Sequence, residues 1–197
     1  MTSAHRLVVI PNFIDDNELL EIAVLLDKAE IGKWKNFCDS PTEKPMVKYD
    51  GKNERYITIP TGTIDPDDNH DLFETFDRSV SRIKEEIERS FRLEVYPESG
   101  YSVTTYVEGN GLIAHFDGVE QVPTPNGHAH RDISSVLYLN DNFVGGITSF
   151  DIQGIDIKPK AGTLILFPGT EPFTHSVSVL ESGLRYIIPQ FWSVKNV

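Results

Sequence analysis

The hydrophobic pattern changes after Pro97 from a helical to an extended period, and this change constrains the fold most strongly. Beyond it, short runs of β-branched and aromatic residues alternate with turns rich in Gly, Pro, Asn and Asp, which predicts strands. We expect eight strands, at residues 101–107, 112–116, 132–139, 147–150, 155–157, 162–167, 173–179 and 184–192. Short strands at this spacing favour a β-sandwich or a β-barrel.

Two helices are expected before these strands. Asp15 offers an N-cap for a helix over residues 18–30, whose apolar residues form a broad face. A second helix, over residues 71–92, has apolar residues at spacings of three and four. These residues are Phe73, Phe76, Val80, Ile83, Ile87 and Phe91. We also expect short strands at residues 7–10 and 56–59, and we expect the helices to pack on a sheet.

Composition limits the possible classes of protein. The chain has 197 residues, of which 39% are hydrophobic, and this is enough for one domain with a sizeable core. We therefore expect a single domain over residues 1–197, with helical support over 1–94 and a β-core over 95–197. A net charge of −12 disfavours nucleic acid as a partner, because phosphate contacts need clustered Lys and Arg.

Cysteine content and the N-terminal sequence bear on the compartment. Cys38 is the single cysteine, so no intrachain disulfide can form, as is usual in a reducing compartment. The apolar run at residues 7–10 is too short for a signal-peptide core or a membrane span. We therefore expect a cytoplasmic protein with no membrane partner.

One group of polar residues predicts a metal site in the β-region. His115 and Asp117 are two residues apart and should point to the same side of a strand. His175 and Arg185 follow within later predicted strands. Two imidazoles and one carboxylate can occupy one face of a ferrous ion and leave the opposite positions open, as in non-haem iron oxygenases. The planar guanidinium of Arg185 suits bidentate binding of a carboxylate, which implies a dicarboxylate co-substrate.

Several motifs occur together in the order that is typical of one enzyme family. They are Tyr106 before a turn, His115-Phe116-Asp117, Arg131 leading into residues 134–140, the stretches 145–150 and 159–167, His175, and Arg185-Tyr186. In these motifs the chain resembles 2-oxoglutarate/Fe(II)-dependent dioxygenases of the prolyl 4-hydroxylase-like group, over its C-terminal half. The resemblance implies an α+β, mainly β fold: a double-stranded β-helix of the jelly-roll type, braced by N-terminal helices.

The resemblance also implies roles for the matching residues. His115, Asp117 and His175 would bind Fe(II), and 2-oxoglutarate and O₂ would take the open positions. Arg185 would pair with the distal carboxylate of 2-oxoglutarate, and Tyr138 would donate its hydroxyl to the same group. Ascorbate is a candidate reductant.

Three further residues match family positions around this centre. Tyr106 and Thr148 would line the co-substrate pocket, and Arg131 would contact a peptide substrate. Hydroxylation of a C–H bond in a peptidyl proline is therefore the expected reaction, with a protein or peptide as the partner.

Two alternatives to this reaction stay open. The substrate can instead be a free amino acid or another small molecule, because fold and iron site are shared across chemistries. A non-enzymatic jelly-roll module that keeps a metal is the second alternative, but it has no need for Arg185 and Tyr138 to converge on a carboxylate. Turnover of 2-oxoglutarate without substrate separates an enzyme from such a module.

Long loops and the last strand lead to further expectations. His128 and His130 lie in a long loop, and we interpret them as solvated residues rather than a second metal site. Segments 31–60 and 118–130 lead to the hypothesis of a lid over the iron, with a fixed loop as the alternative. Pro189 removes a backbone donor from the last strand and predicts a bulge or an edge.

Two aromatic residues end the predicted last strand. Phe191 and Trp192 should close the core, and one of them is a candidate for the mouth of the site.

Overall fold

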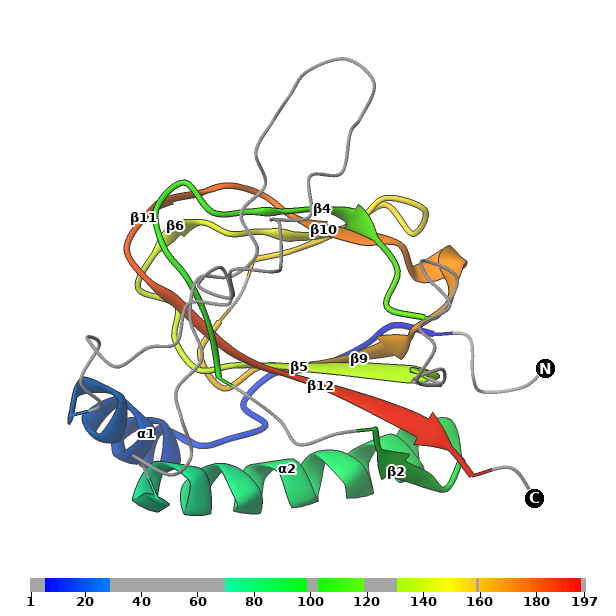
Figure 1. Ribbon diagram of the computed structural model, residues 1–197, viewed down its shortest axis with the longest axis horizontal. Helices are drawn as coiled ribbons and strands as arrows, with labels where there is room; N and C mark the ends of the chain where they lie inside the picture. The colour runs from blue at the N-terminus through cyan, green and yellow to red at the C-terminus, as the bar shows by residue number, and fades with distance from the viewer. Residues whose placement is uncertain (1–5, 29–69, 99–102, 119–130, 159, 196–197) are drawn as a thin grey trace, which may run out of the picture.

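The computed structural model describes residues 6–28, 70–98, 103–118, 131–158 and 160–195. Within these ranges two β-sheets face each other, and two helices cover the outer face of one of them (Figure 1). Several predicted features lie outside the described residues. They are Cys38, His128, His130, the predicted strand at 56–59, and the lid segments except for Gly118.

The larger sheet carries six strands. Its order is β1 (Val8–Ile10), β9 (Leu164–Pro168), β5 (Ile133–Tyr138), β12 (Arg185–Val194) and β2 (Val95–Pro97), and β3 (Thr104–Tyr106) also pairs with β12. The smaller sheet has the order β4 (Leu112–His115), β10 (His175–Val177), β7 (Thr148–Phe150) and β8 (Ile155–Ile157). Two short strands, β6 (Val144–Gly145) and β11 (Leu180–Ser182), pair separately. The paired strands are antiparallel, as a jelly roll requires.

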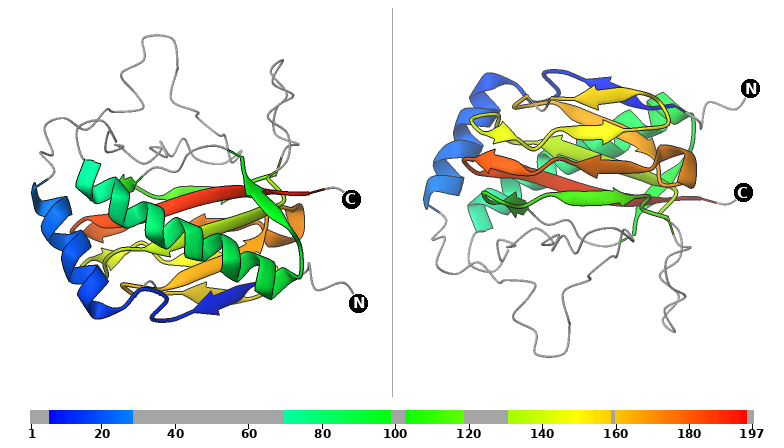
Figure 2. Two further views of the ribbon diagram at one scale, coloured as in Figure 1. Left: turned by 90° about the horizontal axis from the view of Figure 1, so that it is seen from below. Right: turned by 90° about the horizontal axis from the view of Figure 1, so that it is seen from above.

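Helices α1 (Asp16–Lys28) and α2 (His70–Phe91) pack on the larger sheet (Figure 2, left). Asp15 caps α1 as predicted, since its Oδ1 accepts hydrogen bonds from the backbone amides of Asn17 and Glu18. The apolar stripe of α2 faces the sheet, where four of its residues are fully buried: Phe76, Ile83, Ile87 and Phe91. No helix among the described residues is long and apolar enough to cross a membrane.

The strands of the larger sheet divide their side chains between two cores. Ile188 and Trp192 of β12 join the core beneath the helices, together with Leu137 of β5. Ile187 and Tyr138 point to the other face and join the core between the sheets. Because side chains alternate along a strand, β5 and β12 brace the helices with one face and hold the site with the other.

Some predicted strand boundaries are wrong. Strand β4 ends at His115, so Asp117 lies beyond the strand, and alternation along a strand does not place it. The strand predicted at 173–179 is shorter, because β10 ends at Val177 and β11 begins at Leu180. Strands β2, β6 and β11 were not predicted, since runs of two or three residues carry no clear period.

The bulge predicted at Pro189 is absent, because the register between β12 and β5 runs unbroken through the pair Pro189 and Val136. The backbone carbonyls of Tyr186 and Trp192 accept from amides at the two ends of β5, whereas that of Phe191 accepts from Glu98 on the opposite side. Backbone groups alternate sides along a strand, and Pro189 is two residues before Phe191. The ring nitrogen of Pro189 therefore points to the same side as the carbonyl of Phe191, away from β5. It lies between the stretches of β12 that pair with β3 and β2, so no ladder hydrogen bond is lost there.

Candidate metal centre

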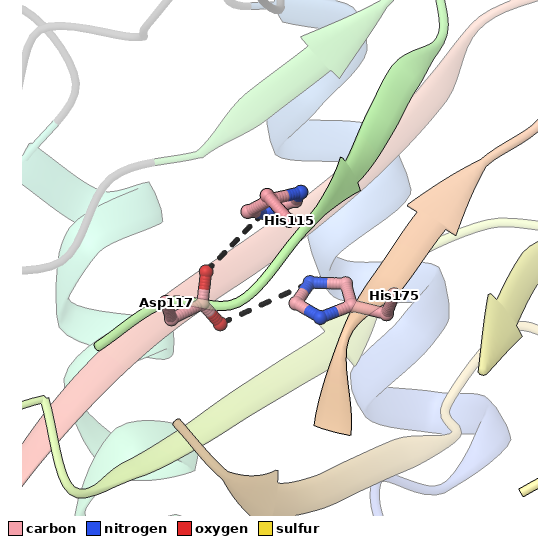
Figure 3. A group of neighbouring side chains, drawn as sticks. All are labelled: His115, Asp117 and His175. Atoms are coloured by element: carbon pink, nitrogen blue, oxygen red, sulfur yellow. Dashed lines mark ion pairs between the residues drawn. The ribbon is translucent and has the colours of Figure 1, made fainter. Parts of the chain in front are cut away.

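Two adjacent strands of the smaller sheet bring the predicted metal ligands together. His115 ends β4 and His175 begins β10, and the two are direct cross-strand partners. Asp117 follows the end of β4 and turns back toward both rings (Figure 3). Its Oδ1 lies 3.3 Å from Nε2 of His115, and its Oδ2 lies 3.9 Å from Nε2 of His175. One ligand atom from each residue lies within 4.8 Å of the others, a spacing that suits a shared metal ion.

Backbone carbonyls fix the orientation of both imidazoles. Nδ1 of His115 lies 2.8 Å from the carbonyl oxygen of Ile113, and Nδ1 of His175 lies 3.1 Å from that of Phe173. A carbonyl can only accept, so each Nδ1 carries the proton and donates it. In the neutral ring the lone pair of Nε2 then points toward Asp117, which is how a histidine presents itself to a metal.

Electrostatics at this centre favours a bound cation. Burial lowers the pKa of His175 more than the nearby charge of Asp117 raises it. Burial also raises the pKa of Asp117, but the hydrogen bond from His115, the positive charges of His175 and His115 and the hydroxyl of Ser134 together hold it below its usual value. Those positive charges require protonated rings, whereas burial opposes protonation of His175. A divalent cation supplies the positive charge with both rings neutral, so the residues fit a metal.

Arg185 forms the second half of the candidate site, on the inner face of β12. It is 1% exposed, and its Nη2 donates to Oγ1 of Thr148 at 3.2 Å, whereas Nε and Nη1 have no hydrogen-bond partner among the described residues. The rings of Tyr106 and Tyr138 flank the guanidinium at 4.5 and 5.3 Å. A buried charge with free donors is costly unless an anion completes it, and a carboxylate matches these donors.

The tyrosines and Thr148 surround this guanidinium. The hydroxyl of Tyr138 lies 2.8 Å from Oγ1 of Thr148, so both arginine and tyrosine meet the same threonine oxygen. Burial raises the pKa of Tyr106 more than the charge of Arg185 lowers it, and Tyr106 therefore stays a neutral hydroxyl. The structure thus places all four predicted co-substrate residues, Arg185, Tyr138, Tyr106 and Thr148, in one cluster.

The cluster and the metal ligands face the same space between the sheets. Ser134 and Tyr138 lie on the same face of β5, and Ser134 donates a hydrogen bond to Asp117. Four residues along a strand span roughly 13 Å between Cα atoms. The metal ligands and Arg185 are therefore contacted from two positions on one face of β5, Ser134 for Asp117 and Tyr138 for Arg185.

Arg131 lies outside both clusters, at the metal end. It is exposed, and its guanidinium stacks 3.8 Å from the ring centroid of Phe191. Phe191 pairs directly with Ser134, so this aromatic ring and not that of Trp192 lies near the metal ligands. Trp192 is buried under the helices, where its Nε1 donates to Oγ of Ser135.

Two segments of the chain, one just after Asp117 and one at Arg131, meet at Gly169. The amide of Gly118 donates to the carbonyl of Gly169 at 2.7 Å. A Cβ at Gly169 would lie 2.0 Å from the carbonyl oxygen of Arg131, so only glycine fits. The amide of Gly169 also donates to the carbonyl of Asp132, the residue before β5, at 2.9 Å. The residue after Asp117 and the residue before β5 are therefore held against the same point of the chain.

Sequence reasoning missed three residues of the centre: Ser134, Phe150 and Phe167. The rings of Phe150 and Phe167 pack against His175 with centroids 5.4 and 4.8 Å away. Ser134 lies four residues before Tyr138 in a predicted strand, so alternation could have placed both on one face. A groove between α1 and α2, lined by Leu20 and Val24, lies on the helix side of the larger sheet and takes no part.

Comparisons with known proteins agree with this geometry. Residues 101–193 match the family model described as the 2OG-Fe(II) oxygenase superfamily. Human prolyl 3-hydroxylase 2 is 32% identical over 75 residues, which are 36% of this chain. The chain covers only 11% of the length of that relative.

Solved structures of prolyl hydroxylases share the fold. A viral collagen prolyl hydroxylase from Paramecium bursaria Chlorella virus-1, solved as a 2OG complex, aligns with a TM-score of 0.63 at 17% identity and covers 100% of this chain and 99% of its own. A prolyl-4-hydroxylase from Pseudomonas putida aligns with a TM-score of 0.65 at 16% identity and covers 98% and 94%. The predicted double-stranded β-helix is therefore confirmed.

These matches agree with the motif order from which the family was recognised. Fe(II) and 2-oxoglutarate, the predicted metal and co-substrate, are those that the family description names. Residues 101–193 thus carry the sequence pattern of the 2OG-Fe(II) oxygenase superfamily on a fold shared with prolyl hydroxylases, and the recognition of this family is confirmed.

Proposed function

We propose that this protein is a 2-oxoglutarate- and Fe(II)-dependent dioxygenase that hydroxylates a C–H bond of a peptidyl proline. The observation that carries the proposal is the pairing of two complementary sites across one inter-sheet space. One is a His-Asp-His group whose ligand atoms lie within 4.8 Å, and the other is the buried Arg185 with free donors. A metal-binding module without this reaction has no use for the second site.

His115, Asp117 and His175 would hold Fe(II), and Arg185 with Tyr138 would bind the distal carboxylate of 2-oxoglutarate. When bound, these groups activate O₂ so that one oxygen atom enters the substrate C–H bond and the other enters succinate, with release of CO₂. The protein holds the imidazoles with Nε2 facing the metal, orients the dicarboxylate and surrounds both with apolar side chains. Among those that exclude water are Phe150, Phe167, Phe173 and Ile187.

The surface beside the metal ligands supports a peptide substrate. Arg131, which is exposed, stacks on the partly buried Phe191 beside the strand position that contacts Asp117. Such a pair offers an apolar surface and a donor for peptide carbonyls. A prolyl hydroxylase from Trichoplax adhaerens, solved in complex with a peptide fragment of a hypoxia inducible factor, shares the fold with a TM-score of 0.62 at 18% identity, covering 95% of this chain and 83% of its own.

The test is incubation with Fe(II), 2-oxoglutarate and ascorbate in the presence of a proline-rich peptide library and, separately, a panel of free amino acids. We expect peptides that gain one oxygen atom on proline, together with an equal amount of succinate. Oxygen gained by a free amino acid alone would make this a small-molecule hydroxylase. Absence of 2-oxoglutarate turnover with every substrate and without substrate, in protein that binds Fe(II), would overturn the enzyme assignment.

A further inference from the structure

The buried hydroxyl of Ser134 connects the larger sheet to a metal ligand. Ser134 lies on the inner face of β5 and is 1% exposed. Its Oγ donates a hydrogen bond of 2.7 Å to Oδ2 of Asp117. This contact crosses from one sheet to the ligand that follows the last residue of β4 in the other sheet.

The three proposed ligands differ in how they are supported. Each imidazole is held by a carbonyl two residues earlier in its own segment, at Ile113 for His115 and at Phe173 for His175. These supports belong to the backbone and remain whatever side chain is present. Asp117 lies beyond β4, and the partner that fixes its carboxylate is the side chain of Ser134. Support for one ligand can therefore be removed by a single substitution.

The hydrogen bond also distinguishes the two oxygens of the carboxylate. Oδ2 accepts from Ser134, while Oδ1 lies 3.3 Å from Nε2 of His115. Adjacent ligand atoms of an octahedral ion with bonds of about 2.1 Å lie about 3 Å apart. Oδ1 and Nε2 are thus already near the spacing of two neighbouring ligands, and Ser134 occupies the other oxygen.

We propose that Ser134 is a positioning residue for metal binding, which holds Oδ2 of Asp117 so that Oδ1 alone is presented to the metal. The inference rests on the metal site of the proposed function. It concerns a hydroxyl that donates to Asp117 and acts through that ligand. The first effect of its loss is therefore on metal affinity, before any effect on turnover.

Ser135 provides a matched control one residue further along β5. It is equally buried, at 1% exposed, but it faces the helices. Its Oγ donates to the carbonyl of Gln190 and accepts from Nε1 of Trp192. Ser135→Ala removes the same atom from the same strand and leaves a buried indole N–H unpaired, so it should lower the thermal unfolding midpoint without reaching the metal ligands.

The experiment measures binding of Co(II) to the metal-free protein, by titration without 2-oxoglutarate and by the visible absorption spectrum of the bound ion. For Ser134→Ala we expect affinity to fall by about 10- to 100-fold and the spectrum to change, because the carboxylate is free to rotate. For Ser135→Ala we expect affinity within about 2-fold of the parent and an unchanged spectrum. Parental affinity in Ser134→Ala, or an equal loss in Ser135→Ala, would overturn the proposal.

A second pair of variants separates the hydroxyl from packing. Ser134→Thr keeps the hydroxyl and Ser134→Val replaces it with a methyl group in a side chain of the same shape, and both suit a strand. We expect Thr to bind Co(II) more tightly than Val by at least about 10-fold. Equal affinity for Co(II) in the two variants would show that the hydroxyl does not position Asp117.

His175→Ala separates this inference from the proposed function. If His175→Ala binds Co(II) as tightly as the parent, the metal site itself is wrong. If His175→Ala loses the metal and Ser134→Ala keeps it, the metal site stands and only the role of Ser134 fails.

Discussion

The metal ligands and the Arg185 cluster face one space between the same two sheets, but their polar groups are satisfied differently. Each metal ligand has its own support, from the carbonyls of Ile113 and Phe173 or the hydroxyl of Ser134. Arg185 donates through Nη2 to Thr148, and its Nε and Nη1 have no hydrogen-bond partner among the described residues. The first group is preorganised by the protein alone, whereas the second is completed by the anion that it binds.

This difference implies two kinds of loss on mutation. Removing a metal ligand takes away a position that no other group can fill. Changing the anion site weakens the binding of one end of a dicarboxylate whose other end would bind the metal. Mutations at the metal ligands should therefore abolish activity, and mutations at the anion site should shift the requirement for 2-oxoglutarate.

The largest effect is expected for His175→Ala, which should abolish iron-dependent succinate production while the β-core stays folded, because an open site has only three protein ligands. Far-ultraviolet circular dichroism checks the fold. His70→Ala is the control, since His70 is an exposed residue on α2. Succinate production at the parental rate in His175→Ala would show that the ligand assignment is wrong.

Arg185→Lys should weaken 2-oxoglutarate binding by roughly 1–3 kcal/mol, because an ammonium keeps the charge but loses the planar fork. Calorimetric titration of the metal-loaded protein without oxygen measures this change. Arg131→Lys alters an exposed arginine at the other end of the site and should leave the titration unchanged. If the two variants bind 2-oxoglutarate equally well, the two regions do not differ as described.

Tyr138→Phe should have a smaller effect in the same titration, about 1 kcal/mol, since it removes one neutral hydroxyl from the anion site. The ring remains beside Arg185, so packing is preserved. Metal affinity should not change, because Tyr138 contacts no metal ligand in the described structure. Tyr96→Phe, at an exposed tyrosine of β2, is the control. A loss of metal affinity in Tyr138→Phe would mean that the two groups are coupled.

The smallest effect concerns the stability of the metal-free protein against pH. Since the pKa of His175 is lower in the folded than in the unfolded chain, the unfolded chain binds protons first as pH falls below about 6.5, and stability should decrease. The lowered pKa of Asp117 has the same sign, with stability lost below about pH 3.8. Thermal unfolding between pH 7.5 and pH 5, a range of about two and a half units, tests the first step. A His175→Asn variant should lose less stability over this range, and an identical pH profile would contradict the role given to His175.

The sequence predicted the group of His115, Asp117 and His175 because the chemistry of such a group is local and the order of its residues is specific. His115 and His175 could be assigned to strands, and the pairing of the two strands then brought them together. Asp117 was predicted on the correct side for the wrong reason, since the strand ends before it. Its position depends on Ser134 and on the backbone bond between Gly118 and Gly169, which are contacts between distant segments.

Contacts between distant segments of the chain were the part that sequence could not supply. Alternation along β5 could separate the face of Ser134 from that of Ser135, but it does not show that Ser134 meets the carboxylate of Asp117. The stack of Arg131 on Phe191 joins residues 60 positions apart in the chain and follows only from the register of β5 and β12. The place of Pro189 also follows only from pairing, because the register of β12 decides which side of the strand its ring nitrogen faces.

The junction at Gly169 has a consequence for how this scaffold can change. Gly118 and Arg131 are the residues on either side of the segment 119–130, and both are fixed to Gly169. That segment can therefore be exchanged, shortened or lengthened between two anchored ends, while Asp117 and Ser134 keep their places. We expect the proposed iron ligands to tolerate such changes, because the described contacts that hold them are made by residues outside 119–130.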